Sequence, residues 1–353
     1  MRASIPTSPC ILPSKSRCRL PFQSLTRLAA WTLPAVAAAS LVFVAGCGNS
    51  GSSSSAEGKA GAGKGKPTIA LVMKSLANEF FQTMEKGAEK HQVAHSSDYD
   101  LVSNGIENEQ DVSKQVELME QMIARKVDAI VIAPADSKAL VPVCKKAQDA
   151  GIVVVNIDNK LDADALKEKG ATIPFVGPDN RKGAKMVGEY LAKQLKPGDE
   201  VALIGGLPGA FNGEQRALGF EDAMKEANAK IVTSQPADWD TGKANSTVAA
   251  FLPRYPGLKA ILCANDSMAL GAVTALNSAN RSKNVLVAGF DNIAAVQQLI
   301  KQGKVLCTAD QHADQIAAQG IEYALEILRK KASPADKELP VDLVNAQTLA
   351  GAK

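Results

Sequence analysis

Short apolar runs alternate with segments of helical periodicity from residue 67 almost to the C-terminus. The expected strands cover 68–73, 99–103, 129–133, 152–157, 172–176, 200–204, 230–235, 260–263, 285–290, 305–309 and 341–344. Strands that are apolar throughout and are each followed by a helix are typical of a parallel sheet covered on both faces. Because a typical sheet has about four to six strands, this number predicts an α/β protein with two doubly wound, Rossmann-like lobes that change over near 175–180.

The segments between these runs carry apolar residues at helical spacing. The expected helices cover 80–91, 109–125, 138–150, 181–195, 213–227, 243–252, 268–279, 294–301 and 314–331. Only the charged segment 158–171 interrupts the alternation, and no strand is expected there.

The N-terminus reads as an export signal rather than as part of either lobe. Its charged residues are all basic, and an apolar stretch over 28–46 ends in small residues and Cys47. This pattern predicts a lipoprotein signal peptide over 1–46, a lipidated Cys47 and a flexible Gly/Ser/Lys tether over 47–66. A retained anchor helix is the alternative, but Pro34 interrupts the stretch, and a membrane span needs about 20 apolar residues.

The charge balance and the cysteines exclude several classes of function. The leader holds five of the 40 Lys and Arg residues and no acidic residue, which leaves 35 basic against 37 acidic residues. We therefore expect no nucleic-acid partner, which would need a clustered basic face. Cys10 and Cys18 leave with the leader and Cys47 takes the lipid, so Cys144, Cys263 and Cys307 remain, and an odd number gives no disulfide framework. We expect Cys263 and Cys307 to be buried within strands, and three scattered histidines predict no metal site.

Polar and aromatic residues follow the expected strands, at the edge where open α/β sheets bind ligands. They are Lys74, Asn78, Phe80, Phe81, Asp158, Asn159, Arg216, Trp239, Asn265, Asp266, Asp291 and Gln311. Carboxylate, amide and guanidinium groups at fixed positions suit the hydroxyls of a polyol. Aromatic rings suit the apolar faces of a sugar ring. We therefore predict a sugar-like ligand between two sheet edges.

Several of these residues have structural alternatives. Arg216 has acidic neighbours on its own helix, Trp239 could lie on the surface, and Lys74 alone would be a solvated lysine. Either phenylalanine could belong to the core, and the two aspartates that follow strands could be turn or cap residues. Of the adjacent pair Asn265 and Asp266, we expect Asp266 to cap the next helix and Asn265 to contact the ligand.

No feature of the sequence indicates catalysis. The glycine-rich segment 205–209 lacks the spacing of a dinucleotide-binding loop, and Pro208 removes an N–H group that a phosphate would use. The sequence shows neither a nucleophile motif nor an acid–base pair, so we expect a binding protein without catalytic residues or a cofactor.

The chain resembles the periplasmic sugar-binding proteins of the ribose/allose/galactose type, which deliver sugars to ABC importers. The resemblance runs from about residue 68 to the C-terminus. Its most specific motifs are TIALV (68–72), SQPADWD (234–240), CANDSMALG (263–271) and GFD (289–291). The segments KSLAN (74–78), IAP (132–134) and VNIDNKLD (155–162) are most similar to the D-allose-binding type. Two positions depart from that type, which has Trp where Phe81 stands and an acidic residue where Asn159 stands.

The resemblance implies sugar contacts at the strand-end positions already named, Phe80 and Asp266 excepted. It also implies an N-terminal lobe over 67–177 plus 312–339 and a C-terminal lobe over 178–311 plus 340–353. A three-segment hinge would lie near 177–180, 311–313 and 339–342. Pro178 and Pro340 fall in these segments.

The expected function is that of a lipid-anchored solute-binding protein in the periplasm or cell envelope. It would capture an allose- or ribose-like monosaccharide and deliver it, as a monomer, to an ABC permease with its ATPase. The alternative is a sensor that presents a sugar or an autoinducer to a membrane receptor kinase. LacI-type repressors share the expected fold but carry an N-terminal DNA-binding helical module, and a signal and a Gly/Ser tether stand in that place here.

Overall fold

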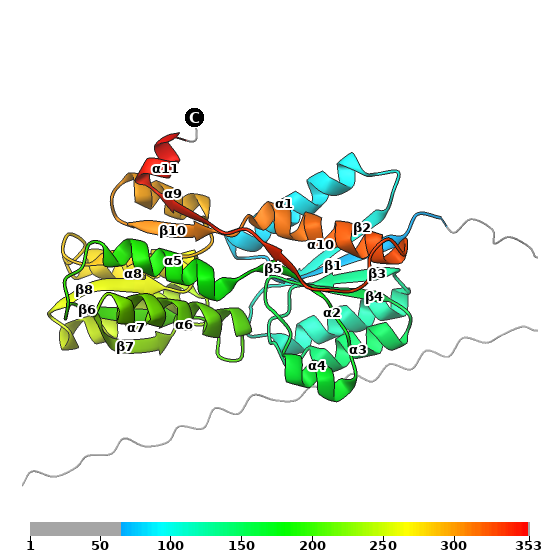
Figure 1. Cartoon of the computed structure of the whole chain (residues 1–353), viewed down its shortest axis with the longest axis horizontal. Helices are drawn as coiled ribbons and strands as arrows, with labels where there is room; N and C mark the ends of the chain where they lie inside the picture. Colours follow the sequence, from blue (N-terminus) through cyan, green and yellow to red (C-terminus); the bar gives the residue numbers. More distant parts are fainter. Residues whose placement is uncertain (1–64, 352–353) are drawn as a thin grey trace, which may run out of the picture. The chain divides into compact units, whose positions relative to one another are not determined.

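The computed structural model describes residues 65–351, which belong to one compact unit (Figure 1). The expected signal peptide, Cys47 and nearly all of the tether lie outside the described residues. Within 65–351, no helix combines the length and apolarity that a membrane crossing requires.

The first sheet has six strands, and all neighbouring pairs are parallel. Their order is β11 (Lys337–Leu339), β5 (Phe175–Pro178), β4 (Val153–Ile157), β3 (Ala129–Ile132), β1 (Thr68–Ser75) and β2 (Asp100–Ile106). Every residue of β3 is buried, which confirms the expectation that apolar runs form central parallel strands. The edge strand β11 was not expected, because its two exposed charged residues break the apolar pattern.

The second sheet also has six strands. Their order is β12 (Asp342–Asn345), β10 (Cys307–Asp310), β9 (Leu286–Ala288), β8 (Leu258–Cys263), β6 (Glu200–Gly205) and β7 (Lys230–Pro236). Four of its five pairs are parallel, but β12 runs antiparallel to β10, with Cys307 opposite Asn345. The expectation of purely parallel sheets is therefore wrong at this edge, where the chain returns after a short link from β11.

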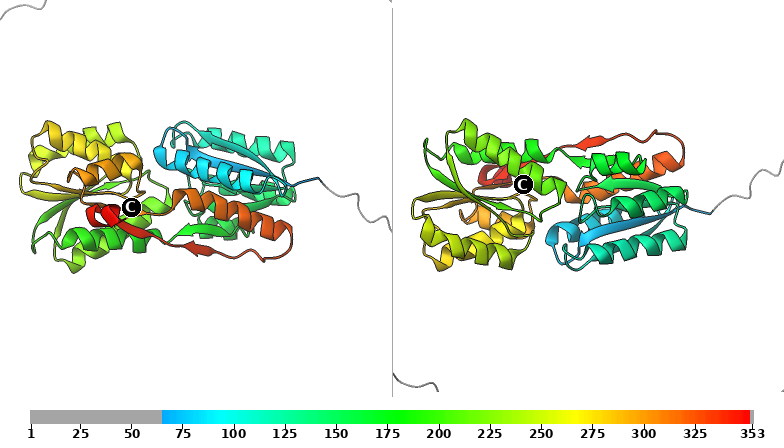
Figure 2. Two further views of the ribbon diagram at one scale, coloured as in Figure 1. Left: turned by 90° about the horizontal axis from the view of Figure 1, so that it is seen from above. Right: turned by 90° about the horizontal axis from the view of Figure 1, so that it is seen from below.

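Helices cover both faces of each sheet. In the first lobe they are α1 (Glu79–Ala94), α2 (Val112–Arg125), α3 (Val141–Asp149), α4 (Ala163–Lys169) and α10 (Ala313–Leu328). In the second they are α5 (Asn180–Ala192), α6 (Phe211–Glu226), α7 (Thr241–Phe251), the 3-10 turn Leu252–Arg254, α8 (Asp266–Ser278), α9 (Ala294–Lys301) and α11 (Ala346–Gly351). The α5–α6 and α7–α8 pairs lie on opposite faces of the second sheet (Figure 2).

Helix ends account for most differences from the expected boundaries. The helix expected from residue 109 begins at Val112, because the Asp111 carboxylate accepts a hydrogen bond from Lys114 N at 3.0 Å. The charged segment 158–171 contains α4, which Asp162 caps and which Gly170 ends with a φ of 61°. All three cysteines within the described residues are buried free thiols, which confirms the expectation for Cys263 and Cys307.

The chain crosses between the sheets three times. It leaves the first sheet after β5, and α5 packs on the second sheet. It returns after β10, since α10 packs on β3, β4 and β5 of the first sheet. The link from β11 to β12 is the third crossing, drawn in red in Figure 1. Two doubly wound lobes joined by three crossings are thus the observed α/β architecture.

Candidate functional site

An inner cavity of about 230 Å³ lies where the carboxyl ends of the two sheets' strands meet. Its lining residues come from both lobes: Lys74, Asn78, Phe80, Phe81, Glu109, Asp158, Asn212, Arg216, Trp239, Asn265, Asp291 and Gln311. Every predicted ligand-binding residue except Asn159 is among them, while Glu109 and Asn212 had not been predicted. These side chains follow the carboxyl ends of parallel strands, where open α/β sheets bind ligands, and they lie together around one cavity.

Lys74 supplies the positive charge of the first lobe. Although a lysine read alone would be solvated, its side chain at the end of β1 is only 2% exposed. Its ammonium lies 3.1 Å from Asp158 Oδ2 and 3.8 Å from Glu109 Oε2. It also lies 5.6 Å from the centre of the Phe81 ring, within cation–π range. Lys74 therefore holds two carboxylates and a ring around one side of the cavity.

Asp158 occupies the first position after β4, with a φ of 61°. Asp and Asn adopt this left-handed conformation more readily than most residues, because their short side chains bond locally. The conformation accords with the turn alternative, but the carboxylate still lines the cavity. Its Oδ2 atom faces the Lys74 ammonium without a hydrogen bond of normal geometry.

Arg216 supplies the positive charge of the second lobe, from α6. It donates hydrogen bonds to Asn180 Oδ1 at 2.8 Å and to the Ala264 carbonyl oxygen at 2.9 Å. Its Nη1 atom lies 3.5 Å from Asp291 Oδ1, and its guanidinium lies 3.9 Å from the centre of the Phe290 ring. These contacts replace the alternative in which Arg216 pairs with acidic residues of its own helix. They hold the guanidinium rigidly while Nη2 is left free of protein partners.

Burial is the largest cause of the pKa shifts of both Arg216 and Asp291. It lowers the pKa of Arg216, although Asp291 and Asp158 oppose the shift. It raises the pKa of Asp291 well above its ordinary value, although Arg216 opposes that shift. Gln311 Nε2 also donates to Asp291 Oδ1 at 2.7 Å. The pair thus bears a desolvation cost that further hydrogen bonds from a ligand would reduce.

Trp239 is the aromatic wall of the second lobe, and its 6% exposure excludes the surface alternative. Its φ of 65° is unusual for a bulky residue and turns the chain after β7. A Cβ atom at Gly206 would lie 2.0 Å from Trp239 Cζ2, so only glycine at 206 lets the indole lie flat against this loop. The rings of Phe80 and Phe81 meet edge to face across the first lobe's side, 5.1 Å apart.

Two asparagines join the site to helix starts. Asn78 Oδ1 accepts from Phe80 N at 3.0 Å and caps α1. Asn265 Oδ1 accepts from Met268 N at 2.8 Å and caps α8. The prediction that Asp266 is the cap is wrong: its buried carboxylate accepts from Thr308 Oγ1 at 2.8 Å and Ile293 N at 3.0 Å. Each cap uses the amide oxygen, which leaves the amide nitrogen for other partners.

Asn159 is buried, but it does not line the cavity. Its Nδ2 atom donates to the Pro134 carbonyl oxygen at 2.9 Å, and its Oδ1 atom accepts from Asn212 N at 3.0 Å. Asn212 lies in the first turn of α6 in the other lobe and does line the cavity. The amide of Asn159 therefore bridges the lobes behind the site, which explains why a short neutral side chain stands there.

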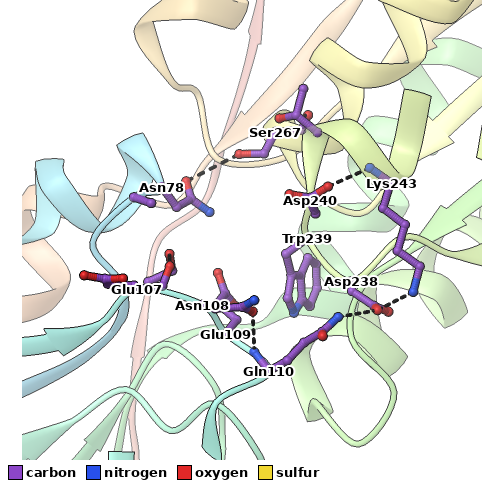
Figure 3. A pocket seen from close by; sticks show the side chains of 13 residues that line it. Asn78, Glu107, Asn108, Glu109, Gln110, Asp238, Trp239, Asp240, Lys243 and Ser267 are labelled. Carbon is purple, nitrogen blue, oxygen red and sulfur yellow. Dashed lines mark hydrogen bonds and ion pairs between the residues drawn. The ribbon is translucent and has the colours of Figure 1, made fainter. Parts of the chain in front are cut away.

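Further hydrogen bonds link the lobes around an outer hollow of about 800 Å³. Gln110 Nε2 donates to Asp238 Oδ2 at 2.7 Å, and Ser267 Oγ lies 3.5 Å from Asn78 Oδ1. Figure 3 shows Asn78 and the loop 107–110 on one side of the hollow and Trp239 on the other. Because Asn78, Glu109 and Trp239 line both spaces, the hollow is the outer side of the inner cavity.

Several polar atoms that line the cavity have no hydrogen-bond partner in the protein. Within residues 65–351, five buried side-chain atoms have no hydrogen-bond partner, and four belong to the cavity: Asp158 Oδ2, Arg216 Nη2, Trp239 Nε1 and Gln311 Oε1. Buried polar groups are nearly always paired in folded proteins. These two acceptors and two donors lie among aromatic rings, and only Asp158 Oδ2 has an ion-pair partner, Lys74. They are therefore suited to a small ligand that both donates and accepts hydrogen bonds, as hydroxyl groups do.

The chain belongs to the periplasmic binding protein family, whose domain model matches residues 69–332. The family consists of binding proteins rather than enzymes, as the lack of catalytic motifs had suggested.

Three similar proteins support this assignment. The D-ribose/D-allose-binding protein of Pseudomonas aeruginosa is 56% identical over 285 residues, 80% of this chain and 89% of that protein. The second is the structure of an ABC transporter solute-binding protein from Burkholderia multivorans, which holds an unknown ligand represented as α-D-erythrofuranose. It is 54% identical to this chain, and the two align with a TM-score of 0.78 over 80% of this chain and 100% of that one. A periplasmic solute-binding protein from Actinobacillus succinogenes with bound D-allose is 39% identical, with a TM-score of 0.77 over 81% and 100%.

Proposed function

We propose that this protein is the extracytoplasmic solute receptor of an ABC importer and that it captures a monosaccharide of the ribose or allose type. The observation that carries the proposal is the set of four unpartnered polar atoms inside an aromatic-lined cavity between two lobes. The relative from Pseudomonas aeruginosa is named for D-ribose and D-allose, and the structure from Actinobacillus succinogenes holds D-allose.

The proposed binding mode follows from the chemistry of the lining. The carboxylates of Asp158 and Asp291 would accept hydrogen bonds from sugar hydroxyls, and Arg216 would donate to them. The Phe81 and Trp239 rings would lie against the apolar faces of the sugar ring. Hydroxyls are costly to bury unless each is paired, and two lobes that close around the sugar pair more of them than one surface does. We further propose that Asn159 positions Asn212 instead of touching the sugar.

The proposed mechanism is hinge closure between an N-terminal lobe (67–177 plus 312–339) and a C-terminal lobe (178–311 plus 340–353). The three crossings near 177–180, 311–313 and 339–342 would serve as the hinge. The closed arrangement would present the sugar to an ABC permease with its ATPase. We also propose that Cys47 carries a lipid that holds the protein at a membrane of the cell envelope, on the basis of the leader sequence alone.

Calorimetric titration of the purified protein with D-ribose, D-allose, D-galactose, D-glucose, D-xylose, D-fructose and myo-inositol tests the proposed function. We expect tight binding of D-ribose or D-allose, with a loss of about 1–3 kcal/mol for an epimer that leaves one buried group unpaired. Absence of heat with both D-ribose and D-allose would refute the proposed ligand class.

A further inference from the structure

Glu109 is an acidic residue of the site that strand-end reasoning did not find. It lies in the loop between β2 and α2 and is only 7% exposed. It lines both the inner cavity and the outer hollow, and in Figure 3 its loop lies opposite Trp239. A glutamate is rarely buried without a partner that compensates its charge.

The compensation that the protein gives Glu109 is weak. Its Oε2 atom lies 3.8 Å from the Lys74 ammonium, which is closer to Asp158, at 3.1 Å. One ammonium group is thus shared between two buried carboxylates, and no other ion pair to Glu109 is found among the described residues. The Asn78 amide is the neutral donor that faces it. Glu109 therefore has acceptor capacity for a donor from a ligand.

We propose that Glu109 is a further ligand-binding residue, which accepts a hydrogen bond from a sugar hydroxyl next to Lys74 and Asp158 and makes sugar affinity depend on pH. This inference rests on the proposed sugar-binding function. The sugar hydroxyl on the side of Lys74 would then contact Lys74, Asp158 and Glu109, instead of Lys74 and Asp158 alone. A charge-assisted bond of this kind is among the stronger contacts that a neutral ligand makes.

The sign of the pH dependence follows from the surroundings of Glu109. Burial raises the pKa of Glu109 to about 7, while Lys74, Asn78 and Arg216 oppose this rise and Asp158 adds to it. A hydroxyl that donates to the carboxylate stabilises its ionised form, so the pKa falls in the complex. Sugar binding then releases a proton, and affinity decreases as the pH falls through 7. Asp291 also lines the cavity, and burial raises its pKa too, so the contribution of Glu109 must be isolated by substitution.

The test compares Glu109→Gln with Glu107→Gln. Gln keeps the shape of Glu but does not ionise in this range, and Glu107 is an exposed glutamate of the same loop that lines only the outer hollow. Titrations with D-ribose and D-allose at about pH 6 and about pH 8 would bracket the pKa of Glu109, which is about 7. Titrations in two buffers with different ionisation enthalpies would report the protons released. Glu109→Asp serves as a second variant, because it keeps a carboxylate but moves it back by one methylene.

We expect the unmodified protein to bind about tenfold more weakly at pH 6 than at pH 8, the change in ionised fraction for a pKa of about 7. Glu109→Gln should bind about tenfold more weakly at pH 8, because a neutral bond replaces a charge-assisted one. It should also have a flatter pH profile, while Glu107→Gln matches the unmodified protein. Glu109→Asp should lose affinity but keep the pH slope.

Glu109→Gln with unchanged affinity and an unchanged pH slope would overturn the inference and leave the proposed function standing. If Glu109→Gln lacks a cooperative thermal transition, the unmodified protein decides: no proton release on sugar binding near pH 7 would overturn the inference. Failure of the unmodified protein to bind either sugar would instead refute the proposed function.

Discussion

Replacement of Asp158 by Asn isolates one charge at the proposed sugar site. Asp158 has a φ of 61°, which Asn also adopts readily, so the turn after β4 should keep its shape. The substitution is nearly isosteric, and it changes the Oδ2 position, which has no hydrogen-bond partner in the protein. The buried Lys74 ammonium loses its nearest anion, so we expect an intact fold with a lower melting temperature. Sugar affinity should also decrease.

The expected loss follows from the bonds involved. A hydrogen bond to a charged group contributes about 1.5–3 kcal/mol, against about 0.5–1.5 kcal/mol for a neutral one. Loss of the charge at Asp158 should therefore cost about 1–2 kcal/mol of binding free energy, and Lys74 then keeps only the more distant Glu109 as an anionic partner. For a complex of about micromolar affinity, near −8 kcal/mol, this is a shift of about five- to thirtyfold in Kd.

Calorimetric titration with D-allose and D-ribose measures the shift, and thermal unfolding monitored by circular dichroism serves as the control. Asp158→Ala removes both oxygens and should abolish detectable binding. If Asp158→Asn and Asp158→Ala both bind as tightly as the unmodified protein, Asp158 does not contact the sugar, and the binding mode proposed above is incorrect.

Three other substitutions test separate parts of the structure. Arg216→Ala should abolish detectable sugar binding. It should also lower the free energy of unfolding by about 3–5 kcal/mol, because the buried Asp291 carboxylate loses its cation. Calorimetry would measure the first effect and urea denaturation the second, and retained affinity would exclude Arg216 from the site. Gly206→Ala should displace the Trp239 indole, whose Cζ2 atom would lie 2.0 Å from the new methyl group, at an overpacking cost of about 1–3 kcal/mol. A changed fluorescence spectrum with weaker sugar binding is expected, and an unaltered spectrum and affinity would contradict this packing argument. Cys47→Ser should leave an unlipidated, mislocalised precursor, as immunoblotting of cell fractions would show, whereas normal anchoring would refute the lipidation prediction.

Most residues that line the cavity were predictable because strand-end residues of parallel sheets lie together at one edge. Glu109 was missed for a specific reason: the strand was expected over 99–103 and the helix from 109, so the residue was assigned to a helix start. β2 in fact extends to Ile106, and the loop after it carries Glu109. The same rule with the correct strand end would have identified it. An error in the expected end of one strand thus removed Glu109 from the predicted site.

Other features depend on contacts between distant segments. Asn265 and Asp266 are equally suitable caps by residue type, and only the position of Thr308 from β10 explains why the carboxylate turns inward. The burial of Lys74 likewise depends on acidic groups from two other segments. β11 contains too few apolar residues to register as a strand, and it exists because β5 offers a free edge.

The three crossings also determine the order in which the lobes are completed during synthesis. The first lobe begins with β1, yet its helix α10 and edge strand β11 come from the last part of the chain. A chain that ends before residue 313 lacks the helix that packs on β3 and β4 and would expose the apolar residues beneath it. The second lobe is nearly continuous and lacks only β12 and α11 at that stage. The first lobe is thus begun first but completed only after nearly the whole chain has been made, and its late, long-range contacts are of the kind that slow folding.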